Sequence, residues 1–116
     1  MQYMLLIYEN ESASGSRPKD EMMRFYAEYT AFSKEISASG HFRAGDGLQA
    51  TSTATTVRVR EGKTLTTDGP FAETREQLAG YYLVEAKDLD TAVGLAARIP
   101  EAKEGSIEVR PVMIYK

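Results

Sequence analysis

Hydrophobic runs in the first third of the chain predict a strand followed by a long helix. Residues 3–8 are continuously apolar and are bounded by polar residues, which is typical of a strand covered on at least one face. Residues 12–17 are small and polar, so we expect a loop there. Residues 18–39 carry apolar side chains at helical spacing, with Pro18 in the first turn and Gly40 as a natural stop. The apolar stripe of this helix consists of Met22, Phe25, Tyr26, Tyr29, Phe32 and Ile36.

The middle of the chain alternates between polar and apolar positions and predicts a hairpin. An extended region begins at 45–48, and residues 56–60 are turned back by 61–63 into 64–66. Residues 68–77 interrupt this pattern with a Gly-Pro pair and are expected to be irregular or to form a single turn.

The last third of the chain predicts a strand, a helix and a final strand. Residues 80–86 have strand composition, and Asp88 is a good N-cap for a second helix. Gly94 lowers the propensity of that helix, which we interpret as a sign of close packing on a sheet. Pro100 helps to end the helix. Residues 107–114 alternate as a last strand, and Pro111 indicates an edge or a bulge.

The order strand, helix, hairpin, strand, helix, strand predicts an α+β fold of the ferredoxin-like type. Both helices would cover one face of an antiparallel sheet. A second copy of the same sheet would cover the other face, so we expect a homodimer. A length of 116 residues is that of one domain, which we place at 1–116.

Composition narrows the possible functions. The net charge is −3, and no run of basic residues is longer than two, which argues against a nucleic-acid partner. The absence of cysteine excludes disulfides and thiolate chemistry, and the single histidine excludes a multi-histidine metal site. We expect no cofactor and no metal. The apolar start is too short for a signal peptide or a membrane span, so the expected location is the cytoplasm, away from the membrane.

Several apparent motifs lack the structural context that they need. Residues 45–50 match the dinucleotide-binding glycine pattern, but a helix is expected before them and extended chain after them. Residues 62–64 resemble the end of a phosphate loop and are better explained as the hairpin turn. His41 is a candidate acid–base residue, although a histidine after a helix also interacts favourably with the helix dipole. Tyr81 and Tyr82 are adjacent on a strand and should point to opposite faces.

Residues 68–77 combine a rigid turn with several carboxylates. Gly69 permits backbone angles that other residues resist, and Pro70 fixes the next φ. If Phe71 anchors the segment in the core, Asp68 and Glu73 are held at defined positions. The alternative is a structural turn whose acidic side chains are solvated.

The sequence 68–82, DGPFAETREQLAGYY, resembles the signature of the DGPF group of YCII-related proteins. The resemblance continues through 1–8, 54–58, 85–86, 97–100 and 108–111, and so covers nearly the whole chain. It implies a ferredoxin-like fold that dimerises through its sheets into an α+β barrel. It also implies a bacterial, regulatory setting, because members often lie beside extracytoplasmic-function sigma factors. The His-Asp pair of shorter members has no histidine on the first helix here, and Asp46 is only a loose counterpart of the aspartate.

Two functional hypotheses follow. In the first, a small-molecule enzyme or binding protein uses an acidic cleft, with Asp68 or Glu73 as general base, made more basic by partial burial, and His41 as a further acid–base group. The residues expected to bind its unknown ligand are Gly69, Pro70, Phe71, Arg75, Glu76 and Tyr82, and Arg58 could also hold an anionic group. In the second, a regulatory accessory protein binds a ligand or a partner in connection with a sigma factor.

Overall fold

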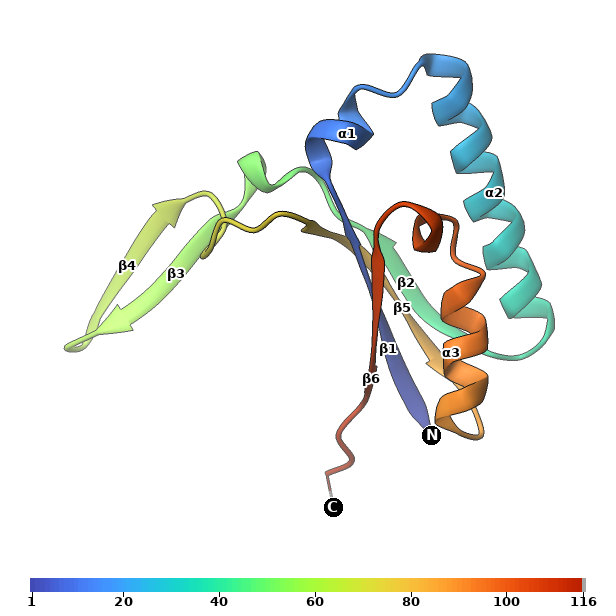
Figure 1. Ribbon diagram of the computed structural model, residues 1–116. Helices are drawn as coiled ribbons and strands as arrows, with labels where there is room; N and C mark the ends of the chain where they lie inside the picture. The colour runs from blue at the N-terminus through green and yellow to red at the C-terminus, as the bar shows by residue number, and fades with distance from the viewer. Residues whose placement is uncertain (116) are drawn as a thin grey trace.

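The computed structural model describes residues 1–115, and their strands form one four-stranded antiparallel sheet and a separate hairpin (Figure 1). The sheet has the order β2-β5-β1-β6, and the hairpin pairs β3 with β4. The strands are β1 (Gln2–Glu9), β2 (Phe42–Gly47), β3 (Thr55–Arg60), β4 (Lys63–Asp68), β5 (Gln77–Glu85) and β6 (Ser106–Pro111). This arrangement confirms the α+β class with antiparallel pairing, and it is compatible with a ferredoxin-like fold. The sheet is not closed into a barrel.

The two longer helices lie on the same side of the four-stranded sheet (Figure 1). The first runs almost as predicted, and the second begins at the predicted cap, where the Asp88 carboxylate accepts a hydrogen bond of 2.9 Å from the Thr91 amide. The helical elements are α1 (Glu11–Gly15), α2 (Lys19–Ala38), η1 (Thr51–Thr53), α3 (Leu89–Ala97) and η2 (Pro100–Lys103).

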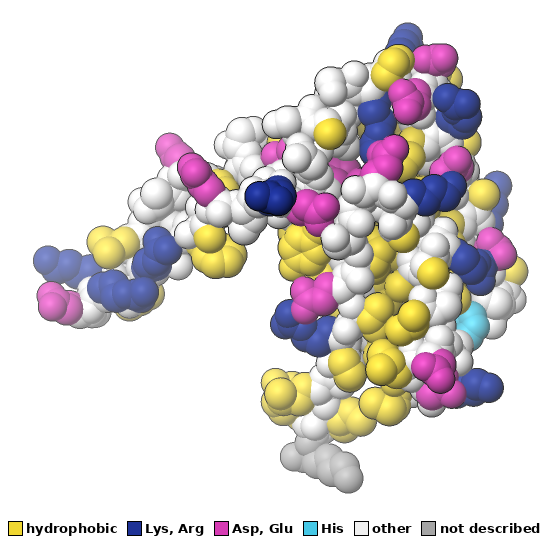
Figure 2. Space-filling model, viewed as in Figure 1, with side chains coloured by type: hydrophobic (Ala, Val, Ile, Leu, Met, Phe, Trp, Pro, Cys, Tyr) yellow, Lys and Arg dark blue, Asp and Glu magenta, His cyan; other side chains and the backbone are white. Residues whose placement is uncertain are grey.

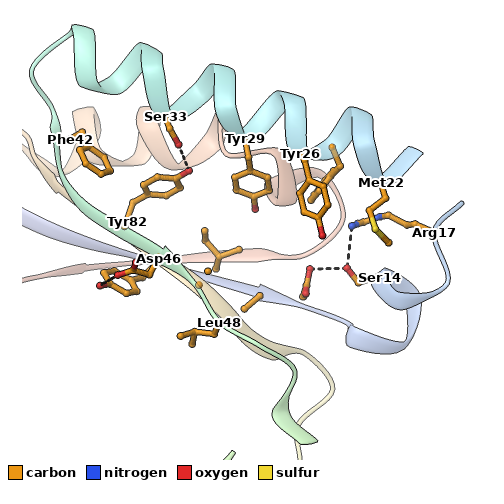
Figure 3. A pocket seen from close by; sticks show the side chains of 18 residues that line it. Ser14, Arg17, Met22, Tyr26, Tyr29, Ser33, Phe42, Asp46, Leu48 and Tyr82 are labelled. Atoms are coloured by element: carbon orange, nitrogen blue, oxygen red, sulfur yellow. Dashed lines mark hydrogen bonds between the residues drawn. The ribbon is translucent and has the colours of Figure 1, made fainter. Parts of the chain in front are cut away.

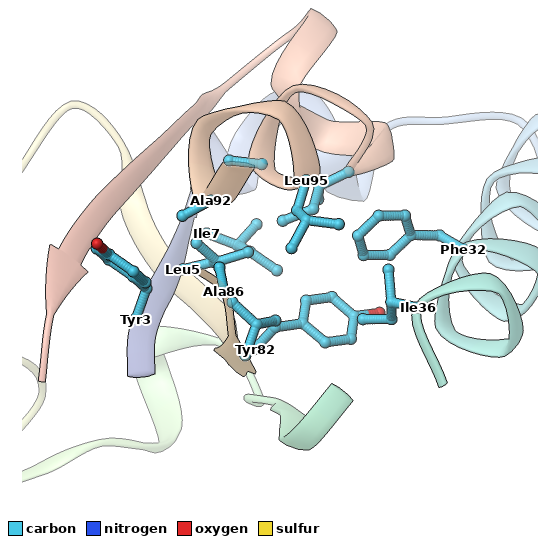
Figure 4. Packing of buried hydrophobic residues seen from close by; sticks show 12 residues of the cluster. Tyr3, Leu5, Ile7, Phe32, Ile36, Tyr82, Ala86, Ala92 and Leu95 are labelled. Atoms are coloured by element: carbon cyan, nitrogen blue, oxygen red, sulfur yellow. The ribbon is translucent and has the colours of Figure 1, made fainter. Parts of the chain in front are cut away.

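The core lies between the sheet and these helices (Figure 4). Alternate residues of β1 and β5 point towards the helices, because side chains along a strand alternate between its faces. Leu5, Ile36 and Val84 are completely buried there. Each such side chain contributes about 1.5–3 kcal/mol relative to an exposed one. The hydrophobic core members are Tyr3, Leu5, Ile7, Phe32, Ile36, Tyr82, Val84, Ala86, Ala92, Leu95, Ala96 and Ile99.

The opposite face of the sheet carries apolar side chains but no helix. Met4 and Leu6 of β1 lie across from Leu83 and Tyr81 of β5, and all four are only partly buried. We call this surface the open sheet face.

The β3–β4 hairpin projects away from the sheet as an arm (Figure 1). Its tip turns through Glu61 and Gly62, whose φ angles of 52° and 74° are those of a tight hairpin turn. Val57 and Val59 stay about 60% exposed along the arm. Because of this projection the radius of gyration is 16.2 Å, whereas a compact domain of this length would have roughly 13 Å.

Three details differ from the predictions. Residues expected to form a loop contain the short helix α1, whose N-cap Asn10 accepts a hydrogen bond of 3.1 Å from the Ala13 amide. Gly94 does not pack closely on the sheet, since a Cβ built there would have no neighbour within 4 Å. The last strand ends at Pro111, so residues 112–114 lie outside it.

Candidate functional site

A cavity of about 550 Å³ opens between α2 and the sheet (Figure 3). This volume lies within the usual range for small-molecule sites. Residues from α1, α2, β1, β2 and β5 line it. Its walls are largely aromatic and are formed by Phe25, Tyr26, Tyr29, Phe42 and Tyr82.

The apolar stripe of α2 serves two purposes along its length. Phe32 and Ile36, in the C-terminal half, are buried in the core. Met22 and Phe25, in the N-terminal half, and Tyr29, at the middle, line the cavity instead and are only partly buried. The aromatic side chains in this half of the helix are therefore available to a ligand.

Glycines in β2 and β5 form part of the cavity lining. A Cβ on Gly80 would lie 2.7 Å from the Asp46 carbonyl oxygen, and one on Gly45 would lie 2.8 Å from Cδ1 of Tyr82. Such distances are too short for real side chains, so these positions require glycine.

The Tyr82 side chain is fixed where it meets the cavity. Its hydroxyl shares a hydrogen bond of 2.7 Å with Ser33 Oγ of α2 (Figure 3). Its ring packs edge-on against Phe32 and Phe42, with centroids 5.2 and 6.3 Å away. Edge-to-face packing of this kind holds a ring in one orientation.

The other end of the cavity is polar. Ser14 Oγ donates to Glu9 Oε2 at 2.8 Å, and Arg17 Nη1 donates to Ser14 Oγ at 3.1 Å. The Arg17 guanidinium also lies 3.4 Å from a Glu101 carboxylate oxygen and forms an ion pair with Glu104. The same guanidinium sits over the Phe25 ring, 4.1 Å from its centroid.

Burial of this polar end changes its titration. Desolvation raises the pKa of Glu101, which is 2% exposed, and the nearby Arg17 only partly opposes the change. Burial also raises the pKa of the Tyr29 phenol, and the neighbouring Glu101 carboxylate raises it further. Burial alone would lower the pKa of Arg17, but its bonds to Glu104 and Glu101 outweigh that effect. Tyr29 is therefore a neutral hydrogen-bond donor and Arg17 a permanent cation.

The predicted segment 68–77 lies at the base of the arm, outside this cavity. Gly69 has a φ of 99°, as expected, and its amide donates to the Ala54 carbonyl at 2.7 Å. Glu76 accepts a hydrogen bond of 2.7 Å from Ser106. Phe71 is 80% exposed, so in the single chain it does not anchor the segment in the core. Four other candidates of this segment are also exposed, namely Asp68, Pro70, Glu73 and Arg75.

His41 also lies apart from the cavity. It follows the C-terminal end of α2, where its Nδ1 lies 2.8 Å from the Glu85 carbonyl oxygen. Its own amide donates to the Ile36 carbonyl at 2.9 Å. Of the candidate residues proposed from sequence, only Tyr82 lines the cavity.

The polar residues of the cavity were not among the sequence candidates. Glu9, Ser14 and Arg17 follow one another across the end of a strand and a short helix, and no spacing rule connects them with α2. The sequence showed only the aromatic part of this lining, as Phe25, Tyr26 and Tyr29 of the α2 stripe.

Comparison with known proteins gives a family but no activity. The family model described as the YCII-related domain matches residues 1–116. An uncharacterized protein of Rhizobium meliloti (strain 1021) is 37% identical over 118 residues, which cover 100% of this chain and 95% of that protein. Within residues 1–115, no helix combines the length and the apolar composition needed to cross a membrane.

Proposed function

The chain belongs to the YCII-related family, and we propose that it acts as a homodimer that binds a small molecule in the cavity beside α2. The observation that carries this proposal is the cavity itself, which combines aromatic walls with a few convergent polar groups. Binding sites for small molecules typically have this composition.

The homodimer is supported by apolar surface that a single chain leaves uncovered. The open sheet face presents Met4, Leu6 and Leu83, and the arm presents Val57 and Val59. Figure 2 shows hydrophobic side chains gathered beside the recess between the arm and the sheet. Extended apolar surface of this kind marks protein interfaces. Pairing of two open sheet faces would produce the α+β barrel that the family resemblance implies.

The dimer also offers an explanation for the exposed segment 68–77. Phe71 is 80% exposed in the single chain, so covering it would bury a large apolar surface. A second copy placed over the base of the arm would bury Phe71 and enclose Asp68 and Glu73. The acid–base role of these carboxylates and of His41 stays a prediction, and it depends on such an enclosure.

A matched pair of variants tests the ligand site. Ser33→Ala removes the hydrogen bond to Tyr82 and leaves the cavity open, whereas Ser33→Met removes the same bond and fills the space. Both variants and the wild type would be screened by thermal shift against a panel of small metabolites. We expect a ligand that stabilises the wild type and Ser33→Ala but not Ser33→Met.

The variant Asp68→Asn tests the alternative that the ligand binds at residues 68–77, at the base of the arm. A ligand whose stabilising effect disappears in Asp68→Asn, while Ser33→Met still binds it, would place the site at residues 68–77 and refute the cavity proposal. A panel without any ligand for the wild type would favour a partner-binding role instead.

Leu83→Lys tests the dimer, because it places a charge in the middle of the open sheet face. Sedimentation velocity should show a dimer for the wild type and a monomer for the variant. Lys34→Leu, on the exposed side of α2, controls for a general effect of altered surface charge. A wild-type chain that sediments as a monomer at tens of micromolar would refute the homodimer.

A further inference from the structure

We propose that the ligand of the cavity is a small organic cation, an ammonium group on an apolar and preferably aromatic body. This inference rests on the proposed ligand site and adds the chemical class of its occupant. It follows from the charges of the lining residues and from the nature of the walls.

The positive charge in the lining is already neutralised by the protein. Arg17 is engaged by two carboxylates, those of Glu101 and Glu104, and by the Ser14 hydroxyl. One face of its guanidinium is covered by the Phe25 ring. Its side chain is only 12% exposed. An anionic ligand would have to compete with two carboxylates for this single cation.

The negative charge in the lining has no such partner. Glu9 accepts a hydrogen bond from Ser14, and within residues 1–115 no cation lies within ion-pair distance of it. Asp46 also belongs to the residues around the cavity, but its carboxylate accepts a hydrogen bond of 2.7 Å from the Tyr81 hydroxyl and so lies with Tyr81 on the open sheet face, not in the cavity. The charged side chains that face the cavity are therefore one carboxylate without an ion-pair partner, that of Glu9, and one neutralised guanidinium, that of Arg17.

The walls favour a cation for a second reason. Figure 3 shows the rings of Tyr26, Tyr29, Phe42 and Tyr82 between α2 and the sheet, and Glu9 lines the same cavity. The face of an aromatic ring attracts a cation, and the attraction strengthens where water is excluded. An ammonium group near Glu9 would gain a charge-assisted hydrogen bond, and its apolar body would extend along the rings towards Tyr82.

A set of three matched probes tests the ligand class. Phenethylamine, phenethyl alcohol and hydrocinnamate share the same phenyl body and differ in their charge. Titration into uniformly ¹⁵N-labelled protein, followed by amide chemical shifts, gives both the affinity and the place of binding. We expect phenethylamine to bind about tenfold more tightly than the alcohol, since a hydrogen bond between two charged groups is stronger than one from a neutral hydroxyl. Hydrocinnamate should bind most weakly.

Glu9→Gln identifies the group responsible. It should lower the affinity for phenethylamine about tenfold and leave that for the alcohol unchanged. Glu28→Gln, which removes an exposed carboxylate of α2 outside the cavity, should change neither. The wild-type ranking of the probes stands as a test even if Glu9→Gln folds poorly.

The outcomes separate this inference from the proposed function. If the alcohol or hydrocinnamate shifts the cavity amides and binds as tightly as the amine, the site stands and the cation preference is refuted. Loss of amine binding in Glu28→Gln to the same extent as in Glu9→Gln would refute the role of Glu9. If no probe shifts the amides of the cavity at millimolar concentration, both the site and its ligand class are overturned.

Discussion

Replacing Arg17 with methionine should destabilise the fold in a strongly pH-dependent way. Methionine keeps much of the apolar stem of Arg17 but removes its charge, so the Glu101 carboxylate loses its buried partner. The two side chains are 12% and 3% exposed, so little water can replace the lost contact.

The expected cost follows from the burial of this pair. Removing one partner of a buried ion pair typically costs 3–5 kcal/mol. The pair with Glu104, whose side chain is 58% exposed, adds less than about 1 kcal/mol. The total loss of stability is limited, because Glu101 can take up a proton and then no longer carries an unpaired buried charge. We therefore expect a loss of about 3 kcal/mol at pH 8 and a clearly smaller loss at pH 5.

The sign of this dependence follows from the raised pKa of Glu101. Above its ordinary value of 4.5, the folded protein holds a proton on Glu101 more readily than the unfolded chain. The stability that protonated Glu101 contributes is fully present below pH 4.5 and is lost as the pH rises through the folded-state pKa of Glu101. Without Arg17 the pKa rises further, so the loss extends to higher pH.

Urea denaturation at a fixed protomer concentration provides the measurement. With a slope of about 2 kcal/mol per molar, a loss of 3 kcal/mol lowers the midpoint by roughly 1.5 M. The double variant Arg17→Met/Glu101→Gln should recover most of this loss, because no unpaired charge stays buried. Glu104→Gln is the surface control and should change the midpoint little. A double variant less stable than Arg17→Met, or a loss that does not depend on pH, would refute the reasoning.

Three further predictions concern backbone and capping positions. Gly105→Ala should cost about 1–3 kcal/mol by urea denaturation, because its Cβ would lie 2.2 Å from the Tyr8 carbonyl oxygen. Gly94→Ala should instead stabilise by about 0.5–1 kcal/mol, since its Cβ meets open space within a helix; a loss would indicate that something covers α3. Asp88→Ala should lower the Tm by several degrees in calorimetry, because Thr91 loses its cap. Hydrogen bonds from Thr91 lower the pKa of Asp88, so the charged cap contributes fully above the ordinary value of 3.8 and its contribution is lost as the pH falls through the folded-state pKa; a wild-type advantage that does not shrink as acid is added would contradict this.

The periodic elements of the fold could be predicted from local sequence. The helix α2, the β3–β4 hairpin and the cap at Asp88 each depend on neighbouring residues, and each is confirmed. The helix α1 was missed because its residues, ESASG, have no apolar periodicity. Contacts outside that segment support it instead, namely the Asn10 cap and the bond between Ser14 and Glu9.

The cavity could not be predicted in the same way. It joins residues as distant in the chain as Glu9 and Tyr82, and its polar end depends on Glu101 from η2. Sequence alone favoured residues 68–77 because the turn chemistry and the carboxylates are adjacent there. Adjacency in sequence does not show whether a segment lines a cavity or lies exposed, and Phe71 illustrates the difference.

The projecting arm allows the proposed homodimer to be tested by limited proteolysis. It is joined to the rest of the chain only at the start of β3 and the end of β4, and Lys and Arg side chains gather at its tip (Figure 2). Trypsin cleaves after such residues, and Arg60 and Lys63 flank the turn. A cut there would nick the chain without removing any strand of the four-stranded sheet. A free subunit should therefore be nicked rapidly at the tip, whereas an arm held against a second copy should be protected, and the rate of cleavage would report the fraction of paired chains.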